Sequence, residues 1–200
     1  LSEPSKRYGV VTAVMSCDLP IGGMTLKRTL RLADNSAFLA VREEITNTGK
    51  LGRVYNIVQH PSIGPGFLDP TVVVDANAWK GFKQGGSMPF PEEPVIYWPK
   101  VVHNGELVDL RKLTVSHEPG VTSFVFADSV KTGWVTALNP GKRLLVGYTW
   151  DVSEYPWLNI WRHVQDGKPV ARGMEFGTTG LHQPYPALVE KREIFGAPLY

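Results

Sequence analysis

Polar and apolar residues alternate with a period of two along much of this chain, and this pattern constrains the fold most strongly. In the segment MTLKRTLRL, residues 24–32, Leu26, Leu30 and Leu32 share one parity, and threonine, lysine and arginine take the other. This pattern is typical of a half-buried strand. It recurs over residues 37–45, and no segment keeps a 3.6-residue period over three turns. The chain is therefore predicted to form strands rather than helices.

Turn-forming residues divide the rest of the chain into further strands. These are predicted at residues 53–60, 71–75, 121–127, 133–138, 143–150, 157–164 and 170–176. A four-residue loop, NPGK at 139–142, joins two of them, and Asp166-Gly167 indicates a β-hairpin between two others. Residues 76–119 are less regular and are expected to be an excursion packed over the sheet. The sequence thus predicts an all-β, antiparallel sandwich or barrel, with residues 1–200 in a single domain.

The charge and cysteine content exclude several classes of partner. The 200 residues include 21 Lys and Arg against 19 Asp and Glu, so there is no electrostatic basis for binding nucleic acid. No apolar run approaches the ~20 residues of a membrane helix. Cys17 is the only cysteine, which favours a reducing, cytoplasmic compartment. The chain begins at Leu1 without an initiator methionine, and we expect it to be part of a longer protein. The oligomeric state is not fixed by the sequence.

The sequence lacks the common metal, phosphate and hydrolase motifs. It contains no GxxxxGK[ST], HExxH, CxxC or GxSxG. No two of its histidines lie within five residues of each other; they are His60, His103, His117, His163 and His182. We therefore expect neither a cofactor nor a metal, with a metal held by residues from distant strands as the alternative.

Two titratable residues near strand ends are the candidates for acid–base chemistry. His60 ends one predicted strand and is followed by Pro61 and a glycine- and proline-rich loop, which is typical of the rim of a binding site. Glu175 lies on a second strand, where Met174 and Phe176 are expected to point to the opposite face. A histidine and a carboxylate facing one pocket can exchange protons with a substrate. An ordinary rim histidine and an outward-facing glutamate are the alternative reading.

A third strand supplies candidate binding residues. Trp157, Asn159 and Trp161 alternate and therefore share a face, so indole rings would flank an amide. Flat apolar rings with amide hydrogen bonds suit the C–H face and hydroxyls of a sugar. The tryptophans fit plain core packing as well. Arg162 is expected to be exposed or paired, or to bind an anionic substituent such as a phosphate.

Three segments resemble the galactose mutarotase (aldose 1-epimerase) family, in the same order along about residues 20–180. EEITNTGKLGRVYNIVQHPSIG is similar to the family segment in which a strand ends on N-H-[ST]-Y-F-N-L. His60 falls on that histidine, although Gln59 replaces the asparagine and the residues after His60 depart from the aromatic run. VARGMEFGTTG resembles the later strand that carries a glutamate, and Glu175 falls on it. SEYPWLNIWR resembles the intervening strand that lines the sugar site.

The resemblance implies a fold and a mechanism. The family fold is a large antiparallel β-sandwich called a supersandwich, and this chain would lack its N-terminal strands and its last C-terminal strands. His60 as imidazolium would protonate the ring oxygen of a monosaccharide, and Glu175 would remove the proton of the anomeric hydroxyl. No cofactor is implied. The family's N-terminal third supplies an arginine and a second histidine, which would precede Leu1. The alternatives are a non-catalytic carbohydrate-binding domain and an accessory domain of a lyase or hydrolase.

Overall fold

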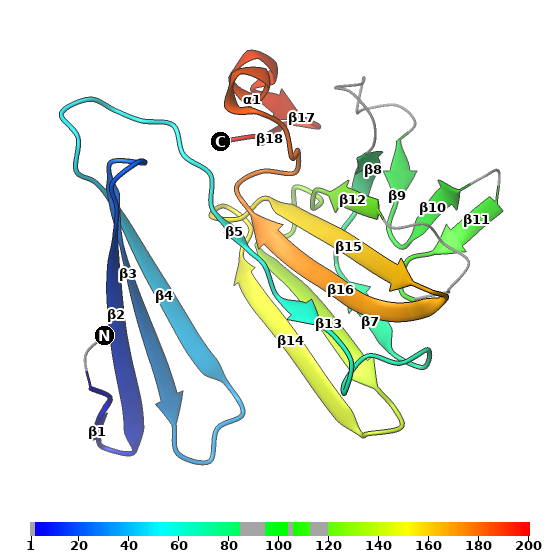
Figure 1. Ribbon diagram of the computed structural model, residues 1–200, viewed down its shortest axis with the longest axis horizontal. Coiled ribbons are helices and arrows are strands. Elements are labelled where there is room, and N and C mark those ends of the chain that lie inside the picture. Colours follow the sequence, from blue (N-terminus) through cyan, green and yellow to red (C-terminus); the bar gives the residue numbers. More distant parts are fainter. Residues whose placement is uncertain (1–2, 85–94, 104–105, 113–119) are drawn as a thin grey trace. The chain divides into compact units, whose positions relative to one another are not determined.

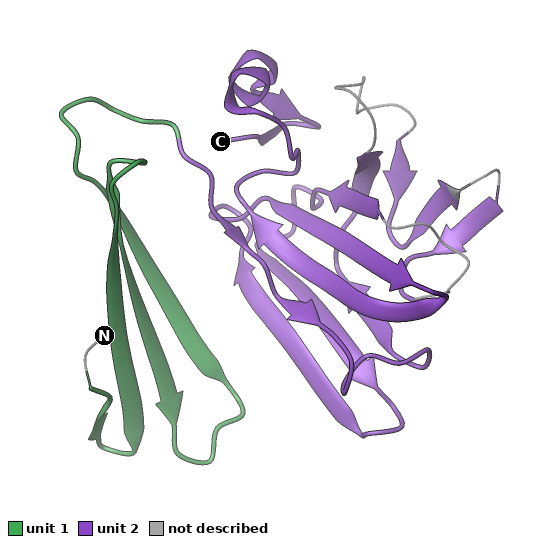
Figure 2. Ribbon diagram, in the orientation of Figure 1, with its two compact units in different colours: residues 1–54 green, residues 55–200 purple. Residues whose placement is uncertain are grey.

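The chain forms two compact units. The structure is a computed structural model, and it describes residues 3–84, 95–103, 106–112 and 120–200. Contacts divide the chain into Leu1–Val54 and Tyr55–Tyr200 (Figure 2). The expectation of a single domain over residues 1–200 therefore stays a prediction.

The first unit is one antiparallel sheet in the order β1-β2-β3-β4 (Figure 1). Its strands are β1 (Ser5–Arg7), β2 (Val10–Leu19), β3 (Met24–Ala33) and β4 (Leu39–Asn47). The strands predicted at 24–32 and 37–45 are confirmed as β3 and β4. The sequence reading missed β1 and β2.

The two faces of this sheet differ in polarity. The register places Val11, Leu32 and Leu39 in one row across three strands, and the neighbouring rows on that face are also largely apolar. Arg28 interrupts the face, and its Nε donates to Glu43 Oε1 at 2.6 Å. None of the described side chains of this unit is buried. No other element of the unit therefore covers the apolar face.

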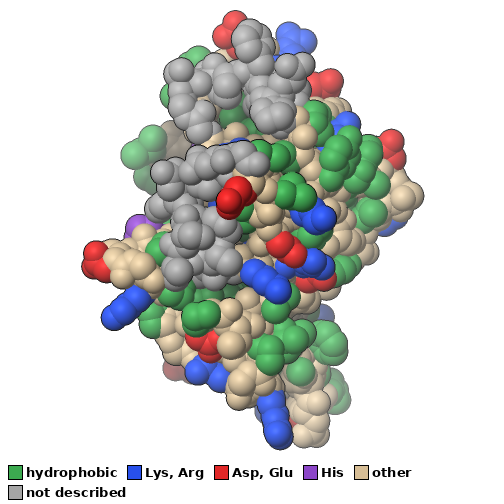
Figure 3. Space-filling view, turned by 90° about the vertical axis from the view of Figure 1, so that its right-hand side faces the viewer, with side chains coloured by type: hydrophobic (Ala, Val, Ile, Leu, Met, Phe, Trp, Pro, Cys, Tyr) green, Lys and Arg blue, Asp and Glu red, His purple; other side chains and the backbone are tan. Residues whose placement is uncertain are grey.

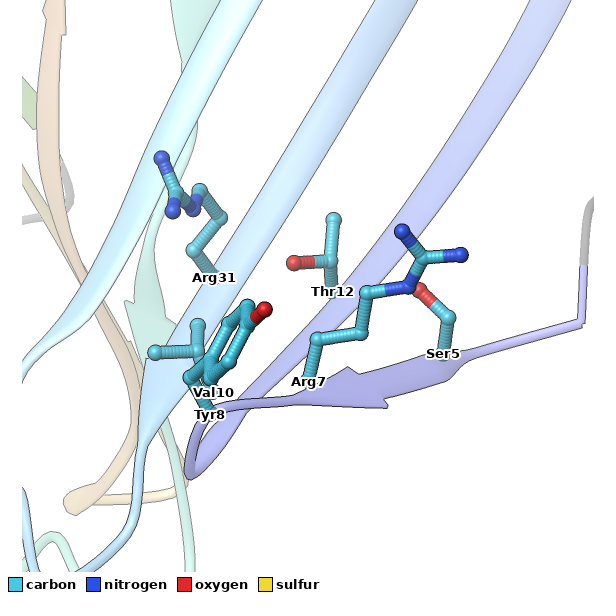
Figure 4. Close-up of a pocket in the computed structure, with 6 residues that line it drawn as sticks. All are labelled: Ser5, Arg7, Tyr8, Val10, Thr12 and Arg31. Carbon is cyan, nitrogen blue, oxygen red and sulfur yellow. The ribbon is translucent and has the colours of Figure 1, made fainter.

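The opposite face is hollowed beside the β1–β2 turn. The hollow has a volume of about 410 Å³ and is lined by Ser5, Arg7, Tyr8, Val10, Thr12 and Arg31 (Figure 4). The two arginine side chains lie on either side of the Thr12 hydroxyl (Figure 4). All of the residues predicted to form the functional site lie in the second unit, so the hollow is separate from that prediction.

The second unit is a sandwich of a large and a small antiparallel sheet (Figure 1). The large sheet has the order β11-β10-β9-β8-β12-β15-β16-β5, and β6 also pairs with β16. Its strands are β5 (Val58–Gln59), β6 (Ser62–Ile63), β8 (Lys80–Gln84), β9 (Ile96–Tyr97), β10 (Lys100–His103), β11 (Glu106–Asp109), β12 (Gly120–Phe124), β15 (Trp157–Gln165) and β16 (Lys168–Gly177). The small sheet, in the order β14-β13-β7, consists of β7 (Val73–Ala76), β13 (Thr132–Asn139) and β14 (Leu144–Asp151).

Every strand pairing among the described residues is antiparallel. The predicted all-β, antiparallel sandwich is therefore confirmed. Asp166 and Gly167 have φ of 51° and 68° and form the two-residue turn between β15 and β16, as their sequence predicts.

Two apolar clusters pack on opposite faces of the large sheet. The cluster between the two sheets includes Leu158 and Met174 from the large sheet and Val135 from the small one. Alternation turns Trp157 to the other face, where a second cluster joins it to Leu188 and other C-terminal residues. The C-terminal elements are α1 (Tyr185–Lys191), β17 (Glu193–Ile194) and β18 (Ala197–Pro198). They cover one part of the face that carries Trp157 (Figure 1).

Two regions differ from the sequence-based expectation. The strand predicted over residues 53–60 is reduced to β5, because only Val58 and Gln59 pair with β16. Before them, the backbone N–H of Ile57 donates to the Thr178 side chain at 3.1 Å rather than to a ladder partner. The described parts of 76–119 extend the large sheet as β8 to β11 instead of lying over it. The prolines and paired glycines of 85–94 lie outside the described residues.

The surface carries charges of both signs. On the face drawn in Figure 3, Lys and Arg side chains are interspersed with Asp and Glu among hydrophobic and neutral residues. Helix α1 has seven residues, and none of the helices in the described ranges has the length and apolar character needed to cross a bilayer.

Candidate functional site

The two residues predicted to be catalytic lie in direct contact. His60 Nε2 is 2.9 Å from Glu175 Oε1, although the residues are far apart in the sequence. The other ring nitrogen of His60, Nδ1, is 3.1 Å from Ser62 Oγ. Both ring nitrogens therefore have polar neighbours, and one of them is a carboxylate.

A break in the strand pairing produces this contact. Gln59 pairs with Phe176 of β16, and Ser62 pairs with Gly173, so β5 and β6 flank an unpaired dipeptide. Pro61 in this dipeptide has no N–H to donate to a ladder, and its carbonyl accepts from the Met174 N–H at 2.9 Å. The interruption leaves the His60 side chain beside β16. The sequence feature that suggested a rim thus corresponds to a short kink along the edge of the large sheet.

Glu175 is a buried carboxylate on a face that contains other polar groups. Its neighbours Met174 and Phe176 point into the cluster between the sheets, as predicted, so Glu175 points to the other face. The Glu175 side chain is 4% exposed, against 57% for His60. Burial raises the pKa of Glu175, and the nearby positive charge of protonated His60 acts in the opposite direction.

Gly173 leaves space for this carboxylate. A Cβ at Gly173 would lie 3.0 Å from Glu175 Oε1 and 3.2 Å from Trp161 Cβ. Trp161 is partly exposed and meets His60 edge-on, with ring centroids 6.2 Å apart. The indole also lies parallel to the imidazole of His163, at 6.0 Å between centroids. The exposed ring of His60 and the tryptophan therefore border the carboxylate together.

Asn159 lies directly across the ladder from Glu175. It is fully buried, and its Nδ2 donates to the Thr179 carbonyl at 3.2 Å. Its Oδ1 is buried without a hydrogen-bond partner in the part of the chain that the structure describes. Asn159 is therefore adjacent to the His60–Glu175 pair but lies beneath the surface.

The structure does not bring Trp157 and Arg162 to this pair. Trp157 shares the face of Glu175, but it is fully buried in the C-terminal cluster, and its Nε1 donates to the Pro198 carbonyl at 2.6 Å. Arg162 points to the opposite face, is 3% exposed, and pairs across the ladder with Arg172. Burial lowers the pKa of both guanidinium groups.

The sequence reading missed His182, which is also close to Glu175. His182 Nε2 lies 3.9 Å from Glu175 Oε2, so the two carboxylate oxygens face different histidines. The backbone N–H of His182 donates to Gln84 Oε1 at 3.0 Å. Burial and the positive charge of His60 lower the pKa of His182. No motif marks this residue, because a loop that folds back over the sheet places it there.

The described residues contain no group of three or more His, Cys, Asp or Glu side chains arranged to hold a metal ion. His163 lies beside Trp161, and His117 falls outside the described residues. The structure thus places the imidazoles of His60 and His182 beside the Glu175 carboxylate, with Trp161 next to His60.

The fold defines a class of protein, an antiparallel β-sandwich built from a large and a small sheet. A search of solved structures found a Klebsiella pneumoniae protein described as a "putative aldose 1-epimerase", with a TM-score of 0.66 and 13% sequence identity. A TPR-domain containing protein from Parabacteroides distasonis matches with a TM-score of 0.64 and 14% identity. At these identities the likeness establishes a shared fold.

This chain spans less than half of each of these proteins. The matches cover 94% and 91% of this chain, but 47% of the Klebsiella protein and 30% of the Parabacteroides protein. No family model matches the sequence, and neither does any curated protein.

Proposed function

We propose that the chain carries the acid–base pair of a sugar 1-epimerase, with His60 as the acid and Glu175 as the base. The single observation that supports this most strongly is the 2.9 Å contact between an exposed imidazole and a buried carboxylate. The pair lies beside a partly exposed tryptophan, and the fold is shared with a protein described as a "putative aldose 1-epimerase".

The proposed reaction interconverts the two anomers of a monosaccharide. His60 donates a proton to the ring oxygen while Glu175 accepts the proton of the anomeric hydroxyl. The bond between C1 and the ring oxygen breaks, and C1 becomes an aldehyde carbon. After rotation about the bond to C2, the ring closes on the other face of C1. On closure, Glu175 gives its proton to the aldehyde oxygen, and His60 takes its proton back from the hydroxyl that attacks C1, so both residues return to their starting states and no cofactor is consumed.

Burial makes Glu175 suitable as the base in this reaction. A carboxylate that loses water is a stronger base, because its charged form is less stabilised. A histidine titrates near neutral pH and can therefore give and retake a proton. Each positioned proton transfer is typically worth about 10²–10⁴-fold in rate.

Proton NMR measurement of anomer exchange on a panel of aldoses tests the proposal. The wild-type chain is expected to accelerate anomer exchange, and His60→Ala and Glu175→Gln are each expected to lose about 10²–10⁴-fold of that acceleration. His163→Gln is the matched control, since this histidine lies on the same face beside Trp161. Acceleration that survives in both variants would refute the assigned roles.

The alternative function is a non-catalytic carbohydrate-binding domain. The observation that favours it is the low accessibility of the Glu175 carboxylate, which is 4% exposed and already in contact with His60. In that case sugars would shift the NMR signals of Trp161 while wild-type chain left the exchange rate unchanged. Equal binding by Glu175→Gln would strengthen this alternative.

A further inference from the structure

The Glu175 carboxylate has a second histidine neighbour that differs from the first in how it is held. His60 is 57% exposed, and its ring contacts Ser62 and Glu175. The His182 side chain is 40% exposed, and its Nε2 lies 3.9 Å from Glu175 Oε2. One carboxylate oxygen thus faces a more exposed imidazole, and the other faces a less exposed one.

His182 is fixed to the sheet through Gln84. The backbone N–H of His182 donates to Gln84 Oε1 at 3.0 Å. The amide nitrogen of Gln84 donates to Ser123 Oγ at 2.7 Å and to the Gly180 carbonyl at 2.9 Å. The same side chain therefore connects strands β8 and β12 to two residues of the segment that follows β16. This arrangement anchors the backbone of His182.

A ligand that approaches Glu175 Oε1 must displace His60, because the imidazole already lies 2.9 Å from that oxygen. Displacement would remove the nearest hydrogen-bonding partner from a carboxylate that is almost entirely buried. A buried carboxylate that loses its partner is strongly disfavoured as the charged form. The site consequently needs a second donor if Glu175 is to remain ionised while His60 engages a ligand.

We propose that His182 is a positioning residue that supplies this second donor, holding Glu175 Oε2 when a ligand displaces His60 from Oε1. The inference rests on the proposed function, in which His60 moves to the ring oxygen of the sugar. A small shift closes the 3.9 Å separation to hydrogen-bond distance. His182 would thereby fix the direction of the Glu175 lone pairs toward the anomeric hydroxyl.

The charges around His182 are consistent with a neutral donor. The titratable groups that face it are Glu175 from β16 and His60 from the link between β5 and β6. Burial and the positive charge of His60 lower the pKa of His182, which favours the neutral form of its imidazole. A neutral His182 can still donate from Nε2–H when the other nitrogen is unprotonated. His182 can therefore orient the Glu175 carboxylate without carrying a charge itself.

The carboxyl carbon signal of Glu175 tests the inference without relying on activity. In chain labelled with ¹³C-glutamate, this signal is assigned by its loss in Glu175→Gln. The His60→Ala variant mimics displacement of His60, and adding His182→Ala is expected to raise the pKa of Glu175 by about one further unit. His182→Gln retains an N–H donor, so His60→Ala/His182→Gln is expected to show a smaller rise in the pKa of Glu175. Identical titration of Glu175 in His60→Ala and in His60→Ala/His182→Ala would overturn the proposal.

Kinetics separates the inference from the proposed function. With His60 present, His182→Ala is expected to lower kcat by roughly 10–100-fold and leave KM nearly unchanged, and His182→Gln to recover part of the loss. An unchanged kcat in His182→Ala would contradict the positioning role. A wild-type chain that accelerates no exchange would refute the epimerase proposal alone, because the titration of Glu175 still decides the role of His182.

Discussion

Gly180 lies against the ring of Trp157, and replacing it with alanine is expected to destabilise the second unit. A Cβ at this position would be 2.0 Å from Trp157 Cε3 and 2.3 Å from Cδ2. Ordinary carbon contacts lie near 3.5 Å, so one partner must move by roughly 1.5 Å. The indole is fully buried and donates a hydrogen bond to the Pro198 carbonyl, and the Gly180 carbonyl accepts a hydrogen bond from the side chain of Gln84. A shift of either the indole or the Gly180 backbone would therefore weaken one of these hydrogen bonds.

The expected cost follows from these two constraints. Overpacking of a core costs about 1–3 kcal/mol, and a lost hydrogen bond adds about 1 kcal/mol. The sum of about 2–4 kcal/mol corresponds to a fall in Tm of roughly 5–15 °C for a chain of this size. Tryptophan fluorescence during thermal and urea unfolding is a suitable assay, because all six tryptophans lie in residues 55–200. Gly120→Ala is the control, since its nearest added contact is Lys83 Cε at 4.0 Å. A Gly180→Ala variant within about 2 °C of Gly120→Ala would refute the reasoning.

Two further predictions concern the carboxylate. Gly173→Ala would place a Cβ 3.0 Å from Glu175 Oε1, and the control Gly147→Ala would place a Cβ 3.0 Å from a threonine methyl outside the site. Both variants should change stability by about 1 kcal/mol or less, but only Gly173→Ala should slow anomer exchange, by about 10-fold. Equal exchange rates in the two variants would contradict this prediction. Burial raises the pKa of Glu175 above 4.5. Between pH 4.5 and the pKa of Glu175 in the native state, the native state therefore holds a proton that the unfolded state has already lost, and stability falls as the pH rises through this range. Glu175→Gln lacks this fall, so its denaturant midpoint relative to wild type should rise as the pH increases from about 4.5. Parallel curves would contradict the assignment, and the exposed Glu154→Gln measures the effect of losing a surface carboxylate.

Local chemistry made much of the fold predictable. Alternation identified β3 and β4 because each has one apolar and one polar face, and Asp166-Gly167 identified a hairpin because both residues adopt positive φ. The strand over residues 10–19 carries the same alternation at Val11, Ala13 and Met15, so its omission was an error of reading. The helix at 185–191 is only seven residues long and gives too few turns for a periodic signal.

The candidate site was predictable only in part, because local patterns in a sequence do not show which distant strands pair. His60 and Glu175 were paired through a family resemblance, and the contact between them depends on the kink at Pro61. Parity correctly placed Trp157 on the same face as Asn159 and Trp161, but it carries no information about the C-terminal residues that cover the Trp157 ring. His182 reaches Glu175 through a loop held by hydrogen bonds from a glutamine side chain, and no spacing rule anticipates such a contact.

The four-stranded sheet of residues 1–54 has a practical consequence for protein engineering. Its apolar face exposes large side chains, with Leu32, Leu39 and Val41 at 41%, 54% and 53% exposure. An exposed hydrophobic surface of this kind promotes association between molecules. A truncated protein that begins at Tyr55 would retain both apolar clusters and every candidate residue from His60 to His182. Such a truncation is expected to be the more soluble half, whereas the sheet expressed alone is expected to aggregate.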